Sequence, residues 1–161
     1  MKKLSSILLA LSLFASANSF AAEQRENGEK IRLLTLSNIE EVPAVKNNFT
    51  GDAFVKPIFS KDSSRLSAGI VTFEAGARTA WHVHPRGQML VILEGKGWTQ
   101  QENSPVIEFQ KGDVVWIPAG TKHWHGASPD FSMSHLAVAP EDENQKSTDW
   151  YEKVSSRQYK K

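Results

Sequence analysis

The sequence predicts an all-β protein, either a sandwich or a barrel built from short strands. Short apolar segments follow one another at even spacing, and glycine, proline or asparagine turns separate them. In addition, no stretch between Arg65 and Ala139 has the periodicity of a helix. The chain has 161 residues, of which 40% are hydrophobic, so we expect one globular domain with a substantial core.

The first 22 residues have the features of a secretory signal peptide. Lys2 and Lys3 form a basic start, residues 4–14 are mostly apolar, and Ala15-Ser16-Ala17 matches a cleavage site. The apolar stretch is too short to span a membrane. We therefore expect residues 1–22 to be removed, which leaves a secreted or periplasmic protein with no membrane attachment.

Charge and cysteine content exclude several classes of function for the mature chain. Loss of Lys2 and Lys3 lowers the formal net charge from +1 to −1, so no basic surface for nucleic acid or anionic lipid is expected. The sequence has no cysteine, and so neither a disulfide nor a thiolate can contribute to the fold or the chemistry. The expected partner is a small molecule.

Residues 23–60 are predicted to hold a leader and the N-terminal strands. Residues 23–30 are charged and form the leader, whereas residues 31–39 are apolar enough for an edge strand. Residues 54–59 are expected to be extended, because Pro57 disfavours a helical conformation at Lys56.

Residues 61–140 are predicted to form the barrel core. In the segment 65–73, alternation places Gly69, Val71 and Phe73 on one face. Residues 88–93 are almost continuously apolar, which is typical of a strand covered on both faces. Further strands are expected at residues 79–84, 98–101, 106–109, 114–117, 123–126 and 132–139.

Residues 141–161 are predicted to end the chain with a short helix and a tail. Thr148 or Asp149 is a suitable N-cap for a helix that contains Trp150, Tyr151 and Val154. Its aromatic side chains are expected to pack against the outside of the barrel or against a partner subunit rather than against a ligand.

The five histidines of the chain all lie between positions 82 and 135, and four of them form two pairs. His82 and His84 are two residues apart, as are His123 and His125, and alternate side chains of an extended segment point to the same face. Neutral imidazole is the commonest metal ligand in proteins. The two pairs therefore predict one metal site in the barrel.

The spacing of these residues resembles the two motifs of the cupin family. The first is Gly76, five residues, His82-x-His84, three residues, Gln88, six residues and Gly95. The second is Gly112, five residues, Pro118-x-Gly120, two residues and His123. This resemblance implies a double-stranded β-helix, or jelly-roll barrel.

A closer resemblance, to the manganese-dependent cupin hydroxynitrile lyases, covers residues 71–88, 112–116 and 122–127 together with Thr148-Asp149-Trp150 and Gln158-Tyr159. It implies a divalent metal held by His82, His84, Gln88 and His123, with manganese first and iron, zinc and nickel as alternatives. Most cupins have glutamate where this chain has Gln88, and the lyase group has glutamine. A neutral ligand set should make the ion a stronger Lewis acid and weaken its binding to the protein. A metal site that has been lost is the alternative interpretation of Gln88.

Cyanohydrin cleavage, the activity that this resemblance implies, needs a group that takes the hydroxyl proton. His125 or His135 is the predicted acid/base, and the sequence does not choose between them. Both could instead orient the ligands. We expect Gly69, Val71 and Phe73 in the wall of the substrate pocket, where small side chains leave space for an aromatic or branched substrate.

Residues near the motifs have simpler predicted roles. Trp81 and Trp124 alternate away from the ligands and are expected in the core. Arg78 could hold an anion near the pocket mouth, although an ion pair with Glu74 or Asp113 is the simpler expectation.

Cupins carry many chemistries, so other functions remain open at this point. One is a metal-dependent dioxygenase that resembles the quercetinases, and another is a non-catalytic barrel that binds a small molecule or a metal. The resemblance also implies a homodimer or larger homo-oligomer, to which residues 31–39 could contribute a strand.

Overall fold

Antiparallel strand pairing organises the computed structural model, which describes residues 30–60 and 62–160. The predicted signal peptide lies outside the described residues. Of the described residues, 34–160 belong to one unit, and no helix in the described part of the chain is long and apolar enough to cross a membrane. The elements in chain order are η1 (Leu36–Asn38), β1 (Val42–Pro43), β2 (Phe49–Thr50), β3 (Ala53–Phe59), β4 (Leu66–Phe73), β5 (Arg78–Thr79), β6 (His82–Val83), β7 (Gln88–Gln101), β8 (Val106–Gln110), β9 (Val114–Ile117), β10 (His123–Ala127), β11 (Met133–Pro140) and β12 (Asp149–Trp150).

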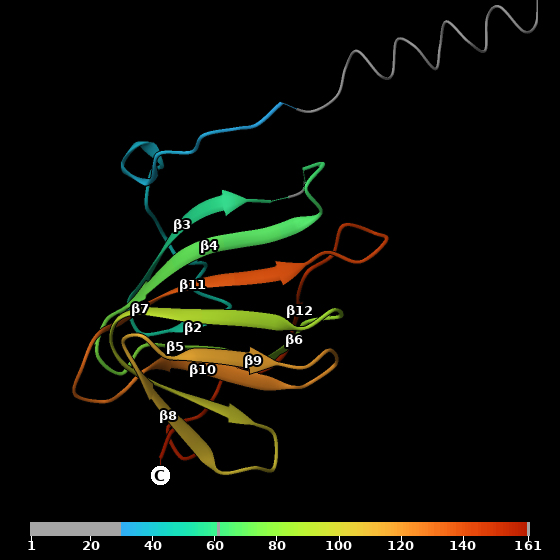
Figure 1. The fold of residues 1–161 in the computed structure, drawn as a ribbon. Coiled ribbons are helices and arrows are strands. Elements are labelled where there is room, and N and C mark those ends of the chain that lie inside the picture. Colours follow the sequence, from blue (N-terminus) through green and yellow to red (C-terminus); the bar gives the residue numbers. More distant parts are fainter. Residues whose placement is uncertain (1–29, 61, 161) are drawn as a thin grey trace, which may run out of the picture. The chain divides into compact units, whose positions relative to one another are not determined.

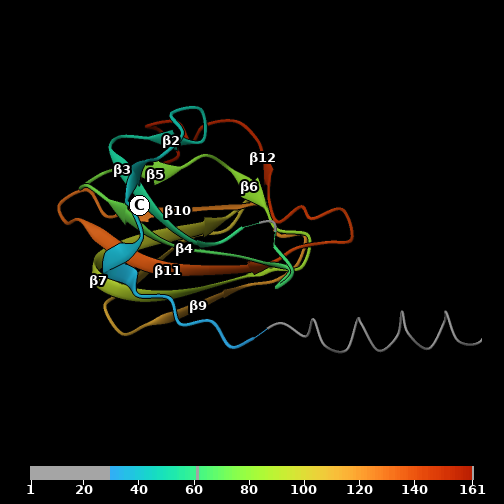
Figure 2. The ribbon, with the colours of Figure 1, turned by 90° about the horizontal axis from the view of Figure 1, so that it is seen from above.

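The 14-residue strand β7 joins the two halves of the barrel (Figure 1). Its first half pairs with β11 and β9, and its second half pairs with β10 and β8. Outward from β11 the sheet continues through β4 and β3 to β1, and outward from β10 it continues through β5 to β2. Strands β6 and β12 lie side by side next to β10, as Figure 2 shows from above. The prediction of an all-β barrel is confirmed.

Alternating side chains along the strands fill the interior. Phe73, Leu90, Ile92 and Met133 are almost completely buried in the main core. Met89, between two buried positions of β7, is 36% exposed. The outer face of this strand is therefore only partly covered, and the expectation that both faces are covered is wrong within the described chain.

The edge strand expected at residues 31–39 does not form. Residues 30–35 have no regular secondary structure, and Leu36–Asn38 is a turn of 3-10 helix. The apolar side chains of this segment stay in solvent, since Ile31 is 102% and Leu33 90% exposed. A strand is stable only against a partner strand, and none of the described strands pairs with residues 34–39.

The prediction of a C-terminal helix is also wrong, because the described residues contain no α-helix. Asp149 and Trp150 instead pair with β6, and the hydrogen bonds continue from Tyr151 N to Trp81 O (2.9 Å) and from Trp81 N to Glu152 O (3.0 Å). This pairing uses the backbone groups that a helix would need. Val154 is buried against Trp81 and Trp124, which confirms the predicted core position of both tryptophans.

Arg78 attaches this C-terminal segment to the barrel and does not form the expected ion pair. Its Nε and Nη2 donate to Val154 O (3.3 and 3.0 Å), and Nη1 donates to Gly76 O (3.1 Å). The guanidinium carbon lies 4.4 Å from the centre of the Tyr159 ring. Burial lowers the pKa of Arg78, and its carbonyl partners explain why neither an anion nor an acidic side chain is needed.

Candidate metal centre

Strand pairing brings both histidine pairs together in the barrel. His82 of β6 lies directly opposite His123 of β10, with ring centroids 4.1 Å apart. His82, His123 and His125 are buried, and one ring nitrogen from each lies within 4.8 Å of the others. The His84 ring lies 5.0 Å from that of His82 and 5.6 Å from that of His123. The predicted convergence of the two pairs is therefore present.

Backbone carbonyl groups fix the orientation of three of these rings. His82 Nδ1 lies 3.0 Å from Ala80 O, and His123 Nδ1 lies 2.9 Å from Thr121 O. His84 Nδ1 lies 2.6 Å from Ser147 O. A carbonyl oxygen only accepts, so each Nδ1 carries the hydrogen and each Nε2 keeps its lone pair. This is the tautomer that a metal-binding histidine needs, and the carbonyls are the supporting partners.

The Nε2 atoms of these three histidines and Oε1 of Gln88 are acceptors, whereas the amide nitrogen of Gln88 is a donor. His84 Nε2 is buried and has no hydrogen-bond partner. Gln88 Oε1 lies 3.2 Å from His123 Nε2, so two acceptors face each other if the carbonyls hold the His123 hydrogen on Nδ1. A cation between these atoms would turn the repulsion into attraction. His82, His84, Gln88 and His123 could thus supply four donors to a divalent ion, whereas the group of three ring nitrogens within 4.8 Å of one another has His125 in place of His84.

Burial keeps the imidazoles neutral. Desolvation, followed by the nearby His123 and His84, holds the pKa of His82 well below its usual value. Desolvation also lowers the pKa of His84, and that of His123 to about 4. At neutral pH the rings therefore have the unprotonated nitrogen that coordinates metals.

His125, which belongs to the group of three ring nitrogens, also contacts His135. His135 Nε2 lies 3.2 Å from His125 Nδ1, and the rings meet edge to face at 4.8 Å. A register shift of β11 between Ser134 and His135 accompanies the placement of His135 in the interior. Desolvation lowers the pKa of His135 to about 4, and desolvation and then the nearby His135 lower the pKa of His125. Two neutral imidazoles can share one hydrogen here and can accept another.

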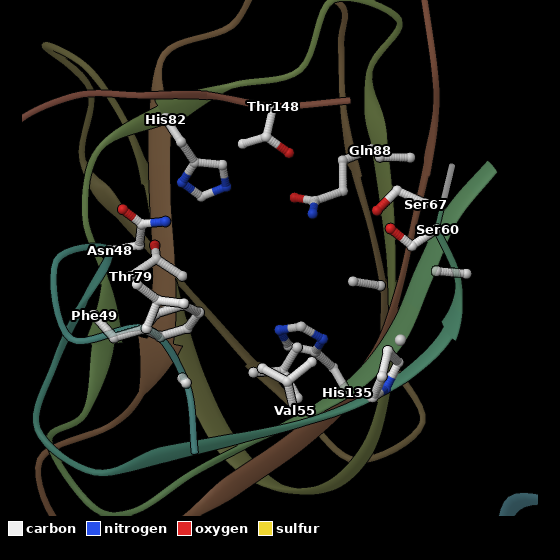
Figure 3. Close-up of a pocket in the computed structure, with 18 of the residues that line it drawn as sticks. Asn48, Phe49, Val55, Ser60, Ser67, Thr79, His82, Gln88, His135 and Thr148 are labelled. Carbon is white, nitrogen blue, oxygen red and sulfur yellow. The ribbon is translucent and has the colours of Figure 1, made fainter. Parts of the chain in front are cut away.

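A cavity of about 400 Å³ opens onto both histidine groups (Figure 3). Gly69 and Val71 line it, whereas Phe73 is completely buried in the core and does not. The Phe73 ring instead lies 5.6 Å from His135 and 6.0 Å from His125. The polar side of the lining includes His82, His84, Gln88, His125 and His135, and the apolar side includes Val42, Pro43, Val55, Pro57, Phe59, Ala68, Ala137 and Ala139.

Several lining residues are not predicted from the sequence as site residues. Trp150 lies 4.8 Å from the His82 ring and Thr148 Oγ1 lies 3.4 Å from His84 Nδ1. Asn48, Phe49 and Thr79 complete this side of the cavity. The only sequence signal for Thr148 and Trp150 is the resemblance of the segment 148–150 to the lyases, because their contacts join positions more than sixty residues apart.

The fold and the histidine cluster together define a double-stranded β-helix with a buried site suited to a metal ion. Residues 69–138 match the cupin domain family. Over 114 residues the chain is 49% identical to an (R)-mandelonitrile lyase from Granulicella tundricola, which covers 70% of this chain and 86% of the relative. The chain belongs to the cupin family.

Solved structures agree with this assignment. A cupin-like protein from Thermotoga maritima has a TM-score of 0.68 and 35% identity, with 76% of this chain and 93% of that chain covered. The polyketide cyclase RemF from Streptomyces resistomycificus has a TM-score of 0.63 and 16% identity, with 81% of this chain and 91% of that chain covered. The second likeness shows the fold alone.

Proposed function

We propose that this protein is a metal-dependent hydroxynitrile lyase that cleaves or forms aromatic cyanohydrins. The observation that carries the proposal is that three of the neutral donors, His82, His84 and Gln88, line one largely apolar cavity together with the neutral pair His125 and His135. The fourth donor, His123, lies behind Gln88 at 3.2 Å. The 49% identity to an (R)-mandelonitrile lyase supports the same reaction.

The proposed ligands are the Nε2 atoms of His82, His84 and His123 and Oε1 of Gln88. The buried His84 Nε2, which has no partner, supports this set. A bound divalent ion would supply Lewis acidity, which lowers the pKa of a hydroxyl group beside it. Manganese is our first choice because the lyase group that the sequence resembles uses it, and iron, zinc and nickel are the alternatives.

The histidine pair would handle the proton. In cleavage, the O–H bond of the cyanohydrin breaks and its proton moves to a ring nitrogen of His125 or His135. The carbon–cyanide bond then breaks, the carbonyl of the aldehyde forms, and the imidazole returns the proton to cyanide as HCN. The low pKa of both rings keeps them unprotonated, and so able to accept, at neutral pH. The apolar wall would hold the aromatic ring and exclude water.

The test uses residues 23–161, stripped with a chelator and reloaded with Mn²⁺. We expect benzaldehyde and cyanide to be released from mandelonitrile by the loaded protein, with loss of activity on chelation and recovery on reloading. Manganese-dependent oxygen consumption with a flavonol, without cyanohydrin cleavage, would favour the dioxygenase alternative. No turnover of either substrate by a fully loaded protein would contradict the proposal.

We also propose that the protein is exported and self-associates. The signal-like residues 1–22 support export. Exposed apolar side chains on the outer face of β9 and β7 support association, since Val114 and Trp116 are 62% and 61% exposed and Trp116 pairs with Met89. Fractionation of the native host and light scattering on the mature protein test the two statements.

A further inference from the structure

Two cavities adjoin the segment that contains β12. Next to the cavity at the histidines is a second cavity of about 420 Å³ with a mostly polar lining. Three residues, Ser60, Thr148 and Trp150, line both cavities. They therefore form the boundary between the two, and Trp150 is the bulkiest of them. The remaining residues of the second cavity are Glu141, Asn144, Gln145, Lys146 and Ser147.

Pairing of β12 with β6 determines the position of Trp150. Trp150 is the register partner of His82, and the two rings lie 4.8 Å apart at 35°. Phe49 approaches the same indole at 5.9 Å. The side chain is still 39% exposed, so its ring is placed by contacts on one side and is not enclosed in a core. A smaller side chain here should open the boundary more than it disturbs the packing.

We propose that Trp150 is a specificity-determining residue, which limits the length of the ring substituent that a substrate at the histidine site can carry. The proposal rests on the proposed function for the identity of that substrate. In the wild type, the indole confines an aromatic substrate to the apolar cavity. With Trp150 shortened, a polar substituent would reach the second cavity, where the hydroxyl groups of Ser60 and Thr148 and the side-chain amides of Asn144 and Gln145 can bind it.

The favoured longer substrates are therefore aryl cyanohydrins with an uncharged hydrogen-bonding group on the ring. Lys146 is paired with Asp149, so the second cavity has no strong preference for an anion. A carboxamide both donates and accepts, which suits the mixed hydroxyl and amide lining.

The experiment compares mandelonitrile with its 4-carboxamide derivative in Mn²⁺-loaded protein. We expect Trp150→Ala to raise the ratio of kcat/KM for the longer over the shorter substrate about tenfold, and Trp150→Phe to raise it less. Tyr151→Ala is the matched control. Tyr151 is the next residue of the same segment, is 50% exposed and lines neither cavity, so its ratio should equal that of the wild type.

A purely structural role for Trp150 predicts a different result. Loss of its contact with His82 would lower kcat/KM for both substrates in proportion, and an unchanged ratio in a folded variant would overturn the proposal. If circular dichroism shows that Trp150→Ala is unfolded, the ratio for Trp150→Phe decides in the same way.

A binding assay that needs no turnover tests the role of Trp150 independently of the proposed lyase activity. Calorimetry with benzyl alcohol and 4-(hydroxymethyl)benzamide measures the same length preference in a protein that cleaves no cyanohydrin. A gain in affinity for the benzamide in Trp150→Ala but not in Tyr151→Ala supports the proposal even if the lyase assay fails. Equal affinities of the wild type and Trp150→Ala for the benzamide overturn it, whatever the lyase assay shows.

Discussion

At the scale of single residues, Gln88 decides how strongly the site attracts a cation. The residue is 5% exposed, and its Oε1 faces His123 Nε2. All four proposed donors are neutral, so Gln88→Glu would add a negative charge directly beside the ion. We expect at least tenfold tighter binding of Mn²⁺, measured by competition with a chelator, and slower cyanohydrin cleavage, because the ion becomes a weaker Lewis acid. Unchanged affinity and unchanged kcat together would contradict this electrostatic interpretation.

Substitution of His135 distinguishes a role in proton transfer from a role in orienting the metal ligands. If it takes part in proton transfer, His135→Asn should lower kcat roughly 100- to 10,000-fold and leave the metal content unchanged. His135 reaches the proposed ligands only through His125, at 3.2 Å. Metal analysis of the purified variant, together with single-turnover kinetics, checks the prediction. A variant that loses metal and activity in parallel would instead show that His135 orients the ligands, and His125→Asn is the comparison variant.

At the scale of secondary-structure elements, the segment from Ser147 to Tyr159, which contains β12, supports the site from outside. The carbonyl oxygen of Ser147 contacts Nδ1 of His84, and β12 pairs with the strand that contains His82. Val154, in the same segment, is only 1% exposed. We expect Val154→Ala to lower the free energy of unfolding by about 2 kcal/mol and to weaken metal binding, since β6 loses support. Thermal and denaturant unfolding of the metal-free protein measure the first effect, and chelator competition measures the second.

Ile107→Ala is the control for that prediction. It removes one carbon more than Val154→Ala does, from a residue that is 60% exposed on β8 and lies outside the proposed association surface, so its stability should stay within about 0.5 kcal/mol of the wild type. Equal losses in the two variants would mean that Val154 does not anchor the segment.

The elements that the sequence predicts well are those whose signal is local. The strands around Val71, Leu90 and His123 follow from alternation and turn residues, and so does the grouping of the histidines. The segments at 31–39 and 149–154 depend on whether a distant partner strand exists, and periodicity does not contain that information. The Ser147 carbonyl that orients His84 is 63 residues away in the chain, so the sequence predicts the ligand but not its support.

At the scale of the whole molecule, the barrel and the site depend on each other because the core contains ionisable rings. All five histidines are at most 3% exposed. The site residues therefore occupy space that apolar side chains fill elsewhere in the barrel. The sequence predicts that these rings converge, but their degree of burial follows only from the complete packing of β4, β10 and β11 around them. The stability of the fold and the protonation state of the site should consequently change over the same pH range.

The pKa values of the buried histidines predict that the metal-free protein is sensitive to acid. In the unfolded chain each ring titrates near its usual pKa of about 6.5, whereas His123 and His135 titrate at about 4 in the fold and the other three are also lowered. Above about pH 6.5 both states are neutral and the full stability is present. As the pH falls toward 4, the unfolded state takes up protons that the folded state does not, so stability decreases.

Because each pKa unit corresponds to about 1.4 kcal/mol, His123 and His135 alone would cost on the order of several kcal/mol across this interval. We expect the Tm of the chelator-treated protein to fall steeply between pH 6.5 and pH 4.5 and the slope to be shallower in His135→Asn. Mn²⁺ binds only the unprotonated rings, so a saturating concentration should move the fall to lower pH. A Tm that stays constant over this interval in the metal-free protein would show that the rings take up protons equally in the folded and unfolded states, and that burial does not lower their pKa values.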